Sequence, residues 1–539
     1  MAETTTLYGE FDYIIAGAGS AGCLLANRLS ADPGCRVLLL EAGGDDKWRW
    51  LHIPVGYLYC IGNPNTDWCF TTHADAGLNG RSIAYPRGRV LGGSSAINGM
   101  IYMRGQQEDY DGWQASGNEG WGWNDILPLF KKFENHYQGE SAFHGASGEL
   151  RVEKQRLHWD ILDAFRSAAE QAGIPKIEDF NCGNNEGSSY FQVTQKKGVR
   201  FSASTAFLNP VKERENLTII TNAVIDRINF QDRNARGLRF RHNNHFFHAN
   251  AKREIVLSAG AIGSVQILQR SGIGSGDLMN SLGIPLVHHL PGVGRNLQDH
   301  LQLRMIYKVE KARTLNTMMR SPLAKAIMGL QYAFLKKGPL TMAPSQLGIF
   351  AKSSPRQTRA NVEYHVQPLS LEKFGDGLHP FPAFTASVCN VRPTSRGTVS
   401  IVSPSLEDKP HILCNYLSTD DDVQVALESI RLTRRIAEQA ALEKYDPQEF
   451  RPGPLAKTDE DLIRAASNIG TTIFHPVGTC KMGNDEQAVV DSRLRVHGIN
   501  RLRVIDASVM PVITSGNTNA PTMLIAEKGA SLILQDASQ

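Results

Sequence analysis

The stretch FDYIIAGAGSAGCLLANRLSADPGCRVLLLE, residues 11–41, decides the fold of this chain. Its apolar beginning runs into three glycines, Gly17, Gly19 and Gly22, in G-x-G-x-x-G spacing. The pattern predicts a buried strand, a glycine turn, a helix over about 21–29 and a second strand over 37–40 that stops at Glu41. These features in this order are typical of a domain that binds an adenine dinucleotide.

Each residue of this unit has a physical role in such a domain. Gly17 permits the tight turn, Gly19 lets the backbone approach a pyrophosphate, and Gly22 lets the helix pack closely on the strand. The helix N-terminus offers free N–H groups and a positive dipole end to the phosphates. Glu41 follows Gly22 by 19 residues and is placed to accept hydrogen bonds from ribose hydroxyls. An acid there disfavours a 2′-phosphate, and the unit alone is compatible with both NAD and FAD.

Composition and charge exclude several classes of protein. A chain of 539 residues with 41% hydrophobic and 21% charged residues is typical of a globular protein with more than one domain. A net charge of +3 provides no general attraction to nucleic acid. Eight cysteines without a C-x-x-C pair predict neither a metal site nor a disulfide scaffold. The polar start MAETTTLYGE and the lack of an 18-residue apolar run lead us to expect a cytoplasmic protein without a membrane span.

Four later segments extend the nucleotide-binding domain. Residues 252–260 (KREIVLSAG) indicate a strand entering a glycine turn, and 260–274 (GAIGSVQILQRSGIG) a helix. Residues 502–511 (LRVIDASVMP) indicate a short strand, and 521–535 a last helix. The middle of the chain, with alternating patterns over 361–369 and 384–391, favours an antiparallel sheet. We predict an α/β chain whose Rossmann-like domain comprises residues 1–155, 206–310 and 461–539, and whose second, α+β domain comprises 156–205 and 311–460.

Residues 322–338, PLAKAIMGLQYAFLKKG, predict an amphipathic helix within the second domain. Leu323, Ile327, Leu330 and Phe334 fall on one helical face, and lysines flank it. We expect this face to pack against the rest of the protein, as such faces do in most globular proteins. The alternative is a surface helix that contacts a membrane.

A second glycine-rich segment, YPRGRVLGGSSAINGMIYMRG, covers residues 85–105. Its glycines and serines can wrap a flat polar ring system and supply backbone N–H donors, and Arg87 lies at its start. Two further turns contain FHPVGTCKMG (474–483) and SGNTNAPT (515–522), on either side of the predicted strand at 502–511. We expect a histidine and an asparagine from these turns to meet where folds of this kind bind ligands.

These motifs together resemble the glucose-methanol-choline (GMC) oxidoreductases, a family of FAD enzymes that oxidise alcohols. GRVLGGSSAIN (88–98) resembles the family's first signature, and GAIGSVQILQRSGIG (260–274) its second, with Val265 where proline is common. PGVGRNLQDH (291–300) is also similar to these enzymes. The resemblance extends from Phe11 to about Leu534, and it implies the GMC fold and FAD as cofactor. Bacterial dehydrogenases of aliphatic primary alcohols, sorbose and polyethylene glycol are most similar, and choline dehydrogenases are similar too.

The resemblance implies roles for individual residues. His475, in the H-P-x-G-T motif, is implied as the general base, and Asn519, in N-T-N-x-P-T, as the residue that orients the alcohol oxygen. Imidazole titrates near neutrality and can take the hydroxyl proton, while an amide N–H can hold the developing alkoxide. The matched positions implied for FAD are Gly17, Gly19, Ser20, Ala21, Gly22, Glu41, Ala42, Arg87, Leu91, Gly92, Gly93, Ser94, Asn98, Gly99, Ile101, Val224, Ala259, Gly260, Asp506, Ala507 and Ala520.

Departures from the family pattern are also informative. Ile97 stands where some relatives tether FAD covalently through histidine, so we expect noncovalent FAD. Gln346 aligns with the glutamate that choline oxidisers use for the trimethylammonium group, which disfavours choline. Phe474 is a further candidate for substrate contact. His365 is either a substrate contact or a satisfied core histidine.

We therefore expect an enzyme that oxidises a primary alcohol to an aldehyde, with hydride transfer to flavin N5. Electrons would pass to a quinone or cytochrome, and peripheral contact with the inner membrane would accompany a quinone acceptor. The alternative is an oxidase of the same family that reduces oxygen to hydrogen peroxide. A non-redox lyase or a photodecarboxylase on the same fold is a weaker alternative, because a histidine and an asparagine are expected beside a redox cofactor.

Overall fold

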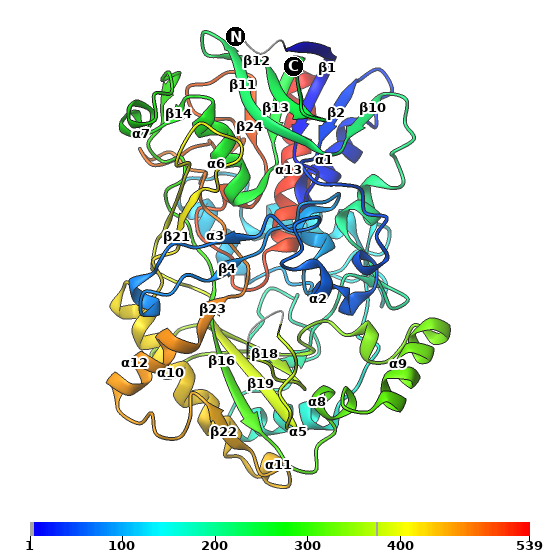
Figure 1. Ribbon diagram of the computed structural model, residues 1–539, viewed down its shortest axis with the longest axis vertical. Coiled ribbons are helices and arrows are strands. Elements are labelled where there is room, and N and C mark those ends of the chain that lie inside the picture. The colour runs from blue at the N-terminus through cyan, green and yellow to red at the C-terminus, as the bar shows by residue number, and fades with distance from the viewer. Residues whose placement is uncertain (1–4, 373–375, 539) are drawn as a thin grey trace.

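The computed structural model describes residues 5–372 and 376–538. The protein is built around two large sheets (Figure 1). The first sheet, in the upper half of Figure 1, contains seven strands. In spatial order they are β10 (Leu217–Ile220), β2 (Val37–Leu40), β1 (Thr6–Ala16), β13 (His245–Leu257), β12 (Asn234–His242) and β11 (Ala223–Gln231), with β24 (Leu502–Val504) beside β13.

The parallel core of this sheet forms from the stretch that opens the chain. β1 pairs in parallel with β2 and β13, and its last residues are fully buried because both faces are covered. The chain turns at Gly17 into α1 (Ser20–Leu29). A Cβ atom on Gly22 would overlap the carbonyl oxygen of Gly17, so only glycine allows the helix to lie this close to the strand. The predicted strand, turn, helix and second strand are confirmed.

The last helix of the chain completes the same half of the molecule. α13 (Asn519–Ala537) packs directly against α1, although the two helices lie at opposite ends of the sequence. α6 (Gly260–Arg270) follows β13, as expected, and packs against β11. The strand expected over 502–511 is shorter, because Asp506 caps a 3₁₀ turn, η7 (Ala507–Val509), by accepting the Ser508 N–H at 2.8 Å.

The second sheet is antiparallel throughout, which confirms the expectation for the middle of the chain. Its strands, in order, are β22 (Gln448–Arg451), β16 (Leu301–Lys308), β19 (Ala383–Asn390), β18 (Val362–Gln367), β17 (Leu347–Ala351) and β7 (Gly187–Tyr190), with β23 (Gly470–Thr472) beside β16. α10 (Asp420–Ala437) packs against β19, and α12 (Asp459–Ile469) against β16. β16 and β23 belong to this sheet, although the expected boundaries at 310 and 460 put both in the first domain.

Shorter elements connect the two sheets. The remaining helices are α2 (Tyr57–Cys60), α3 (Gln107–Ala115), α4 (Trp123–Phe133), α5 (Asp160–Gln171), α7 (Gly276–Ser281), α8 (Leu315–Met318), α9 (Pro322–Leu335) and α11 (Ala440–Glu443). Two-stranded pairs are β3 (Phe70–Thr71) with β4 (Ala84–Tyr85), β5 (Glu134–His136) with β6 (Leu150–Val152), β8 (Gln195–Lys196) with β9 (Val199–Arg200), β14 (Ile273–Gly274) with β15 (His288–His289), and β20 (Thr398–Ser400) with β21 (His411–Leu413).

The helix predicted over 322–338 forms as α9 but does not pack as expected. It projects from the right side of the lower half in Figure 1. Its only buried side chains are Met328 and Tyr332, whereas the apolar face expected to be covered is exposed to solvent. Among residues 5–372 and 376–538, no helix is both long and apolar enough to cross a bilayer.

Candidate active site

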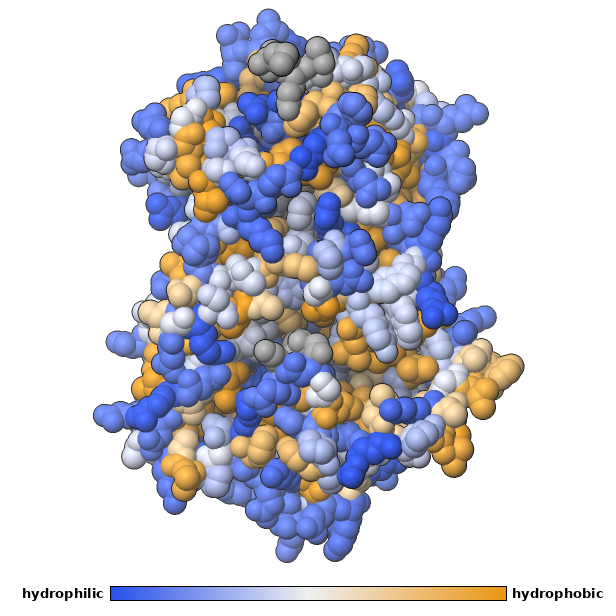
Figure 2. Space-filling model, in the orientation of Figure 1, coloured by the Kyte–Doolittle hydropathy of each residue, from blue (hydrophilic) through white to orange (hydrophobic). Residues whose placement is uncertain are grey.

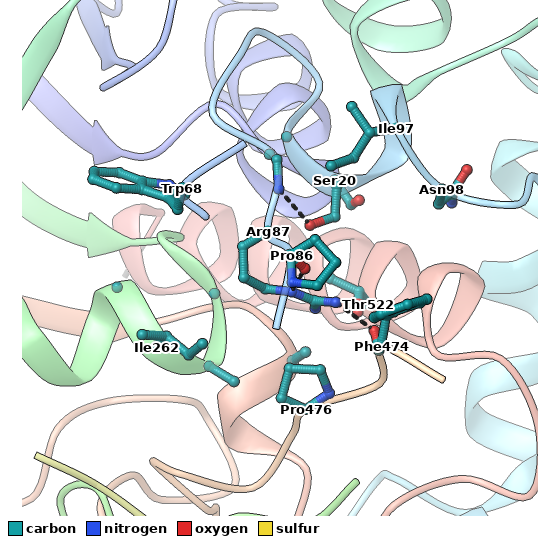
Figure 3. Close-up of a pocket in the computed structure, with 18 of the residues that line it drawn as sticks. Ser20, Trp68, Pro86, Arg87, Ile97, Asn98, Ile262, Phe474, Pro476 and Thr522 are labelled. Atoms are coloured by element: carbon teal, nitrogen blue, oxygen red, sulfur yellow. Dashed lines mark hydrogen bonds between the residues drawn. The ribbon is translucent and has the colours of Figure 1, made fainter. Parts of the chain in front are cut away.

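A cavity of about 310 Å³ extends from the carboxyl ends of the first sheet to the second sheet. Four stretches of the chain, within 17–101, 223–270, 302–367 and 473–522, line it together with Leu406. Figure 3 shows side chains from these parts converging, with Arg87 reaching across to Phe474. Parallel sheets place ligands at this edge because the helix N-termini and the loops after the strands meet there.

Two glycine loops form the floor of the cavity at the first sheet. A Cβ atom on Gly93 would lie 2.7 Å from the Cα atom of Gly19, so the two backbones touch without side chains between them. A Cβ on Gly19 would meet nothing closer than 4.0 Å, which leaves space above that residue. The N-terminus of α1 lines the same floor through Ser20 and Ala21. This arrangement suits a pyrophosphate, because backbone N–H groups and a helix dipole face the cavity.

Two buried acids lie farther along the first sheet. Glu41 accepts N–H groups from Ala18 at 2.9 Å and from Gly43 at 2.7 Å, and it lines the cavity. Burial raises the pKa of Glu41 to about 7. Asp506 accepts the Gly260 N–H at 2.9 Å, and burial raises its pKa. Each Glu41 oxygen accepts one backbone N–H and keeps a further lone pair, so the side chain could also accept from a ribose hydroxyl in the cavity.

Most of the residues expected at the cofactor or substrate reach the cavity. The expected residues that line it are Gly17, Gly19, Ser20, Ala21, Glu41, Ala42, Arg87, Gly93, Ser94, Asn98, Gly99, Ile101, Val224, Ala259, Gly260, Asp506, Ala507, His365, Phe474, His475 and Asn519. Those outside the lining are Gly22, Leu91, Gly92, Ala520 and Gln346.

The residues outside the lining have structural positions that explain their absence. Gly22 lies inside the contact between α1 and β1. Leu91 and Gly92 hold the second glycine loop in place, because their N–H groups donate to the carbonyls of Gly44 and Ala18. Gln346 is fully buried, and its amide donates to the Ala343 carbonyl at 2.5 Å. The expectation that Gln346 contacts the substrate directly is therefore not met in this structure.

His475 lies at the opposite end of the cavity, in the turn after β23. Its main-chain N–H donates to Asp299 at 2.8 Å, and Asp299 also accepts the Thr472 hydroxyl at 2.6 Å. Phe474 adopts a positive φ of 71°, which is rare for a bulky residue. Arg87 donates to the Phe474 carbonyl at 2.6 Å and holds this conformation. The surroundings therefore fix the backbone that presents His475.

A chain of hydrogen bonds determines which ring nitrogen of His475 carries a proton. His300 Nε2 lies 3.2 Å from the Val391 carbonyl oxygen, which can only accept. Burial lowers the pKa of His300 to about 3, so the ring is neutral and its Nδ1 carries a lone pair. His475 Nδ1 lies 3.0 Å from that nitrogen and must donate to it. Burial, with His300 next in effect, lowers the pKa of His475 well below 6.5, so its Nε2 carries a lone pair.

Asn517, rather than Asn519, contacts this lone pair. The Asn517 side-chain amide lies 3.2 Å from His475 Nε2, and both residues line the cavity. Asn519 begins α13, where its side-chain oxygen accepts the Ser20 hydroxyl at 2.7 Å. The expected meeting of a histidine and an asparagine is present, but with the first asparagine of the N-T-N motif. The two asparagines are two residues apart, and the start of α13 between them turns their side chains to different partners.

The sequence analysis missed three residues of this site, namely Asp299, His300 and Asn517. Asp299 and His300 end the PGVGRNLQDH motif, which in the sequence shows a family resemblance but no role for either residue. A charged residue followed by a histidine after a glycine-rich turn was the available signal. Their function depends on β16 pairing with β23, which brings residue 300 beside residue 475, and no local pattern predicts that pairing.

The part of the cavity beside the second sheet is lined without a charged side chain. Gln302, Pro344, Ser345, His365 and Gln367 contribute there. Within the described chain, the carboxylates that line the cavity are Glu41 and Asp506, and the cations are Arg87 and Arg270; all four come from outside the second sheet. His365 Nε2 lies 3.1 Å from Glu363, and its ring stacks on Phe191, so this histidine both lines the cavity and has core partners.

Comparisons with known proteins agree with this geometry. Residues 11–302 match the N-terminal GMC oxidoreductase domain and residues 393–526 the C-terminal one. An alcohol dehydrogenase (acceptor) from Pseudomonas putida is 41% identical over 97% of this chain and 96% of its own length. Mitochondrial choline dehydrogenase from Homo sapiens is 39% identical over 97% and 90%.

Solved structures give the same result. Pyridoxine 4-oxidase from Mesorbium loti is 31% identical, with a TM-score of 0.88 over 98% of this chain and 99% of its own. An FAD-dependent oxidoreductase from Chaetomium thermophilum is 27% identical, with a TM-score of 0.90 over 98% and 100%. The predicted GMC fold is confirmed. The chain belongs to the GMC oxidoreductase family, and it is an FAD-dependent oxidoreductase that acts on alcohols.

Proposed function

We propose that this protein oxidises a neutral primary alcohol to an aldehyde, with His475 as the general base. The observation that carries the proposal is the orientation of His475. Its Nε2 carries a lone pair and no proton, and lies beside Asn517 in the cavity. Its other ring nitrogen, Nδ1, is hydrogen-bonded to His300. A base in this state can accept a hydroxyl proton directly.

The residues of the cavity fit FAD. The touching backbones of Gly19 and Gly93, together with the α1 N-terminus, would hold the pyrophosphate, and Glu41 would hold the adenosine ribose. When bound, FAD supplies the acceptor for the hydride that the alcohol carbon loses. We propose noncovalent binding, because Ile97 lines the cavity at the position of the covalent tether in some relatives, and an alkyl side chain cannot form that bond.

The chain's own residues carry the proton and position the oxygen. The alcohol hydroxyl transfers its proton to His475 Nε2, and the Nδ1–H bond to His300 keeps the ring oriented as it becomes charged. We assign the alcohol oxygen to Asn517, because its amide already faces the accepting nitrogen of His475. Asn519, held by Ser20, is assigned to the cofactor side of the cavity. Phe474 and His365 are proposed as walls of the alcohol site.

A neutral substrate is favoured by the lining of the second-sheet end. A trimethylammonium group leaves water at lower cost where an acid replaces its hydration, and the second-sheet residues that line the cavity, Gln302, Pro344, Ser345, His365 and Gln367, include no carboxylate. This argument disfavours choline, although choline dehydrogenases are among the relatives. A panel of alkanols, diols and choline, read by flavin absorbance, tests it. Faster bleaching by choline than by every neutral alcohol would overturn the assignment.

The electron acceptor is proposed to be a quinone or a cytochrome, in a cytoplasmic protein attached peripherally to the inner membrane. Support comes from the relative named as an acceptor-dependent alcohol dehydrogenase. The second candidate is an oxidase, because pyridoxine 4-oxidase shares the fold. Comparing peroxide production with reduction of a quinone-like dye under air separates the two: peroxide in equal yield to aldehyde would favour the oxidase.

The catalytic assignment is tested by anaerobic mixing of the holoenzyme with alcohol. The flavin absorbance should bleach, and His475→Ala should slow bleaching by at least ~100-fold, the lower range for loss of a general base. FAD content and secondary structure should be unchanged. Rapid bleaching in His475→Ala would remove the role given to this residue, and failure of all alcohols to bleach the wild-type enzyme in the dark would favour a lyase or a photodecarboxylase.

A further inference from the structure

The α9 surface, defined here as Leu323, Ile327, Leu330, Phe334 and Leu335, is the densest exposed apolar group on the described chain. These side chains are 54–81% exposed. The first four follow helical spacing and share one face, while Met328 and Tyr332 anchor the opposite face to the protein. In Figure 2 the same projecting lobe, at the lower right, is coloured as hydrophobic. Large exposed patches of this kind mark binding surfaces.

The sequence on both sides of α9 is strongly basic. From residue 311 to residue 351 the sequence contains no aspartate or glutamate, and its basic residues are Lys311, Arg313, Arg320, Lys325, Lys336 and Lys337. The β8–β9 turn adds Lys196 and Lys197, and it touches the end of the helix, because a Cβ on Gly198 would overlap the Lys336 carbonyl oxygen. None of these eight cations is paired with a carboxylate among the described residues; Lys336 and Lys196 lie over the rings of Tyr332 and Phe201 instead, and Arg320 donates to the Pro380 carbonyl.

The α9 surface adjoins the substrate end of the cavity. The chain passes from α9 through the 3₁₀ helix η6 (Pro339–Thr341) to Pro344 and Ser345, which line the cavity. A second 3₁₀ helix, η2 (Pro54–Gly56), packs on η6 and leads into α2. Tyr57 of α2 lines the cavity, while its neighbour Tyr59 is exposed. If α9 were bound to an external surface, an apolar molecule that left that surface would therefore be next to the cavity.

We infer that α9 inserts into the headgroup region of an anionic bilayer and anchors the protein at the membrane surface. An exposed apolar helix face with basic residues around it is the combination that anionic membranes bind, since apolar side chains enter the boundary while lysines and arginines attract the lipid charge. A second copy of the chain would place the same eight cations against one another, which disfavours a dimer through this surface. The inference concerns attachment, and it stands whether or not the alcohol or acceptor proposed above is correct.

The test uses the FAD-loaded protein and vesicles of defined composition. Wild-type protein should co-float with vesicles of 30% phosphatidylglycerol in phosphatidylcholine. It should bind pure phosphatidylcholine at least tenfold more weakly, because the attraction of about eight cations is lost. Raising the salt to 0.5 M should weaken binding to the anionic vesicles for the same reason.

Matched variants distinguish vesicle binding through the α9 surface from nonspecific binding by other exposed apolar residues. Leu330→Ser/Phe334→Ser should weaken binding by at least tenfold per side chain, the ratio expected for loss of a buried large apolar group. Leu286→Ser/Leu455→Ser changes two exposed leucines elsewhere, 48% and 89% exposed, and should bind like wild type. Lys325→Glu/Lys337→Glu should lose the preference for anionic vesicles.

Bleaching of the flavin by alcohol, followed without an acceptor, should be the same in every variant and serves as the folding control. Equal vesicle binding by wild type and Leu330→Ser/Phe334→Ser would overturn the inference. Absence of wild-type binding to anionic vesicles would overturn it too. A wild-type dimer that Leu330→Ser/Phe334→Ser converts to a monomer would assign the α9 surface to a second copy instead.

Discussion

At the scale of single residues, the direction of one hydrogen-bond chain decides what His475 can do. A carbonyl oxygen at Val391 fixes the proton on His300, and His300 in turn fixes the proton on His475. Neither histidine needs a charged partner for this, which differs from sites where a carboxylate orients the base. Because burial lowers its pKa, the His475 ring also stays neutral in mildly acidic solution.

The first prediction concerns His300 as a positioning residue. In wild type, the rate of anaerobic flavin bleaching should stay constant as the pH falls from 8 to 6. The reason is that His475 has a pKa well below 6.5 and loses its lone pair only at lower pH. His300→Ala opens space beside the ring and should raise that pKa, so the rate should begin to fall near pH 6.5. His289→Ala, at an exposed histidine, is the control. Identical pH profiles for wild type and His300→Ala would contradict the role.

The second prediction separates the two asparagines of the N-T-N motif. Asn517→Ala should slow bleaching by about 100-fold, the cost of removing one donor to a developing oxyanion, with FAD content unchanged. Asn519→Ala should retain most of the bleaching rate but lose FAD more readily on dilution, since it breaks the bond to Ser20. A larger loss of rate in Asn519→Ala than in Asn517→Ala would restore the original expectation.

At the scale of elements, the opening unit was predictable because its constraints are local. Gly17, Gly22 and the alternation from strand to helix are consequences of neighbours within a few residues. The antiparallel second sheet was predictable for the same reason, from alternating strands such as β18 and β19. The pairing of β16 with β23 was not, because it joins residues about 170 positions apart. The contact between Gly19 and Gly93 also depends on the folded loops rather than on spacing.

The amphipathic helix α9 shows a second limit of sequence patterns. A periodic apolar face predicts a helix, and the helix is present. The same face is found on helices that cover a core and on helices that bind a membrane or a partner, so periodicity cannot decide exposure. The charge pattern held the missing information, since the 41 residues from 311 to 351 contain no acid.

The third prediction compares two glycines of one turn. Gly22→Ala should destabilise the domain strongly, because the new methyl group would overlap the Gly17 carbonyl oxygen. Gly19→Ala should fold with little change in thermal midpoint, because its backbone φ of −80° suits alanine and its Cβ would meet nothing closer than 4.0 Å. Its methyl group would enter the pyrophosphate space, so FAD affinity should fall at least tenfold. Thermal melting and FAD titration measure the two effects. A Gly19→Ala protein that binds FAD like wild type would argue against this pyrophosphate position.

At the scale of the whole molecule, the cavity is lined by segments that lie far apart in the sequence. Its lining combines the first sheet, the loops around His475 and the second sheet. A cofactor bound there would contact residues of both halves of the molecule. The cavity therefore couples ligand binding to the stability of both halves, because a ligand that binds only the folded state stabilises it.

The fourth prediction follows from this coupling. Free FAD at a hundredfold excess over its Kd should stabilise the apoprotein by about 2.7 kcal/mol, and the thermal midpoint should rise with FAD concentration. AMP, which fits only the Glu41 end and should therefore bind more weakly, should give a smaller rise at the same free concentration. Differential scanning fluorimetry of apoprotein with each ligand measures both. A midpoint that does not respond to FAD would contradict binding at this cavity.

The contact between α1 and α13, sealed by the hydrogen bond from Ser20 to Asn519, has a consequence for synthesis of the protein. The glycine turn emerges from the ribosome before its packing partner α13 and the strand β24, which are made some 480 residues or more later. The nascent chain therefore holds an unfinished nucleotide site while these residues are added. Asn519 and Thr522 of α13 line the cavity, so we expect stable capture of FAD only after the last helix has been made.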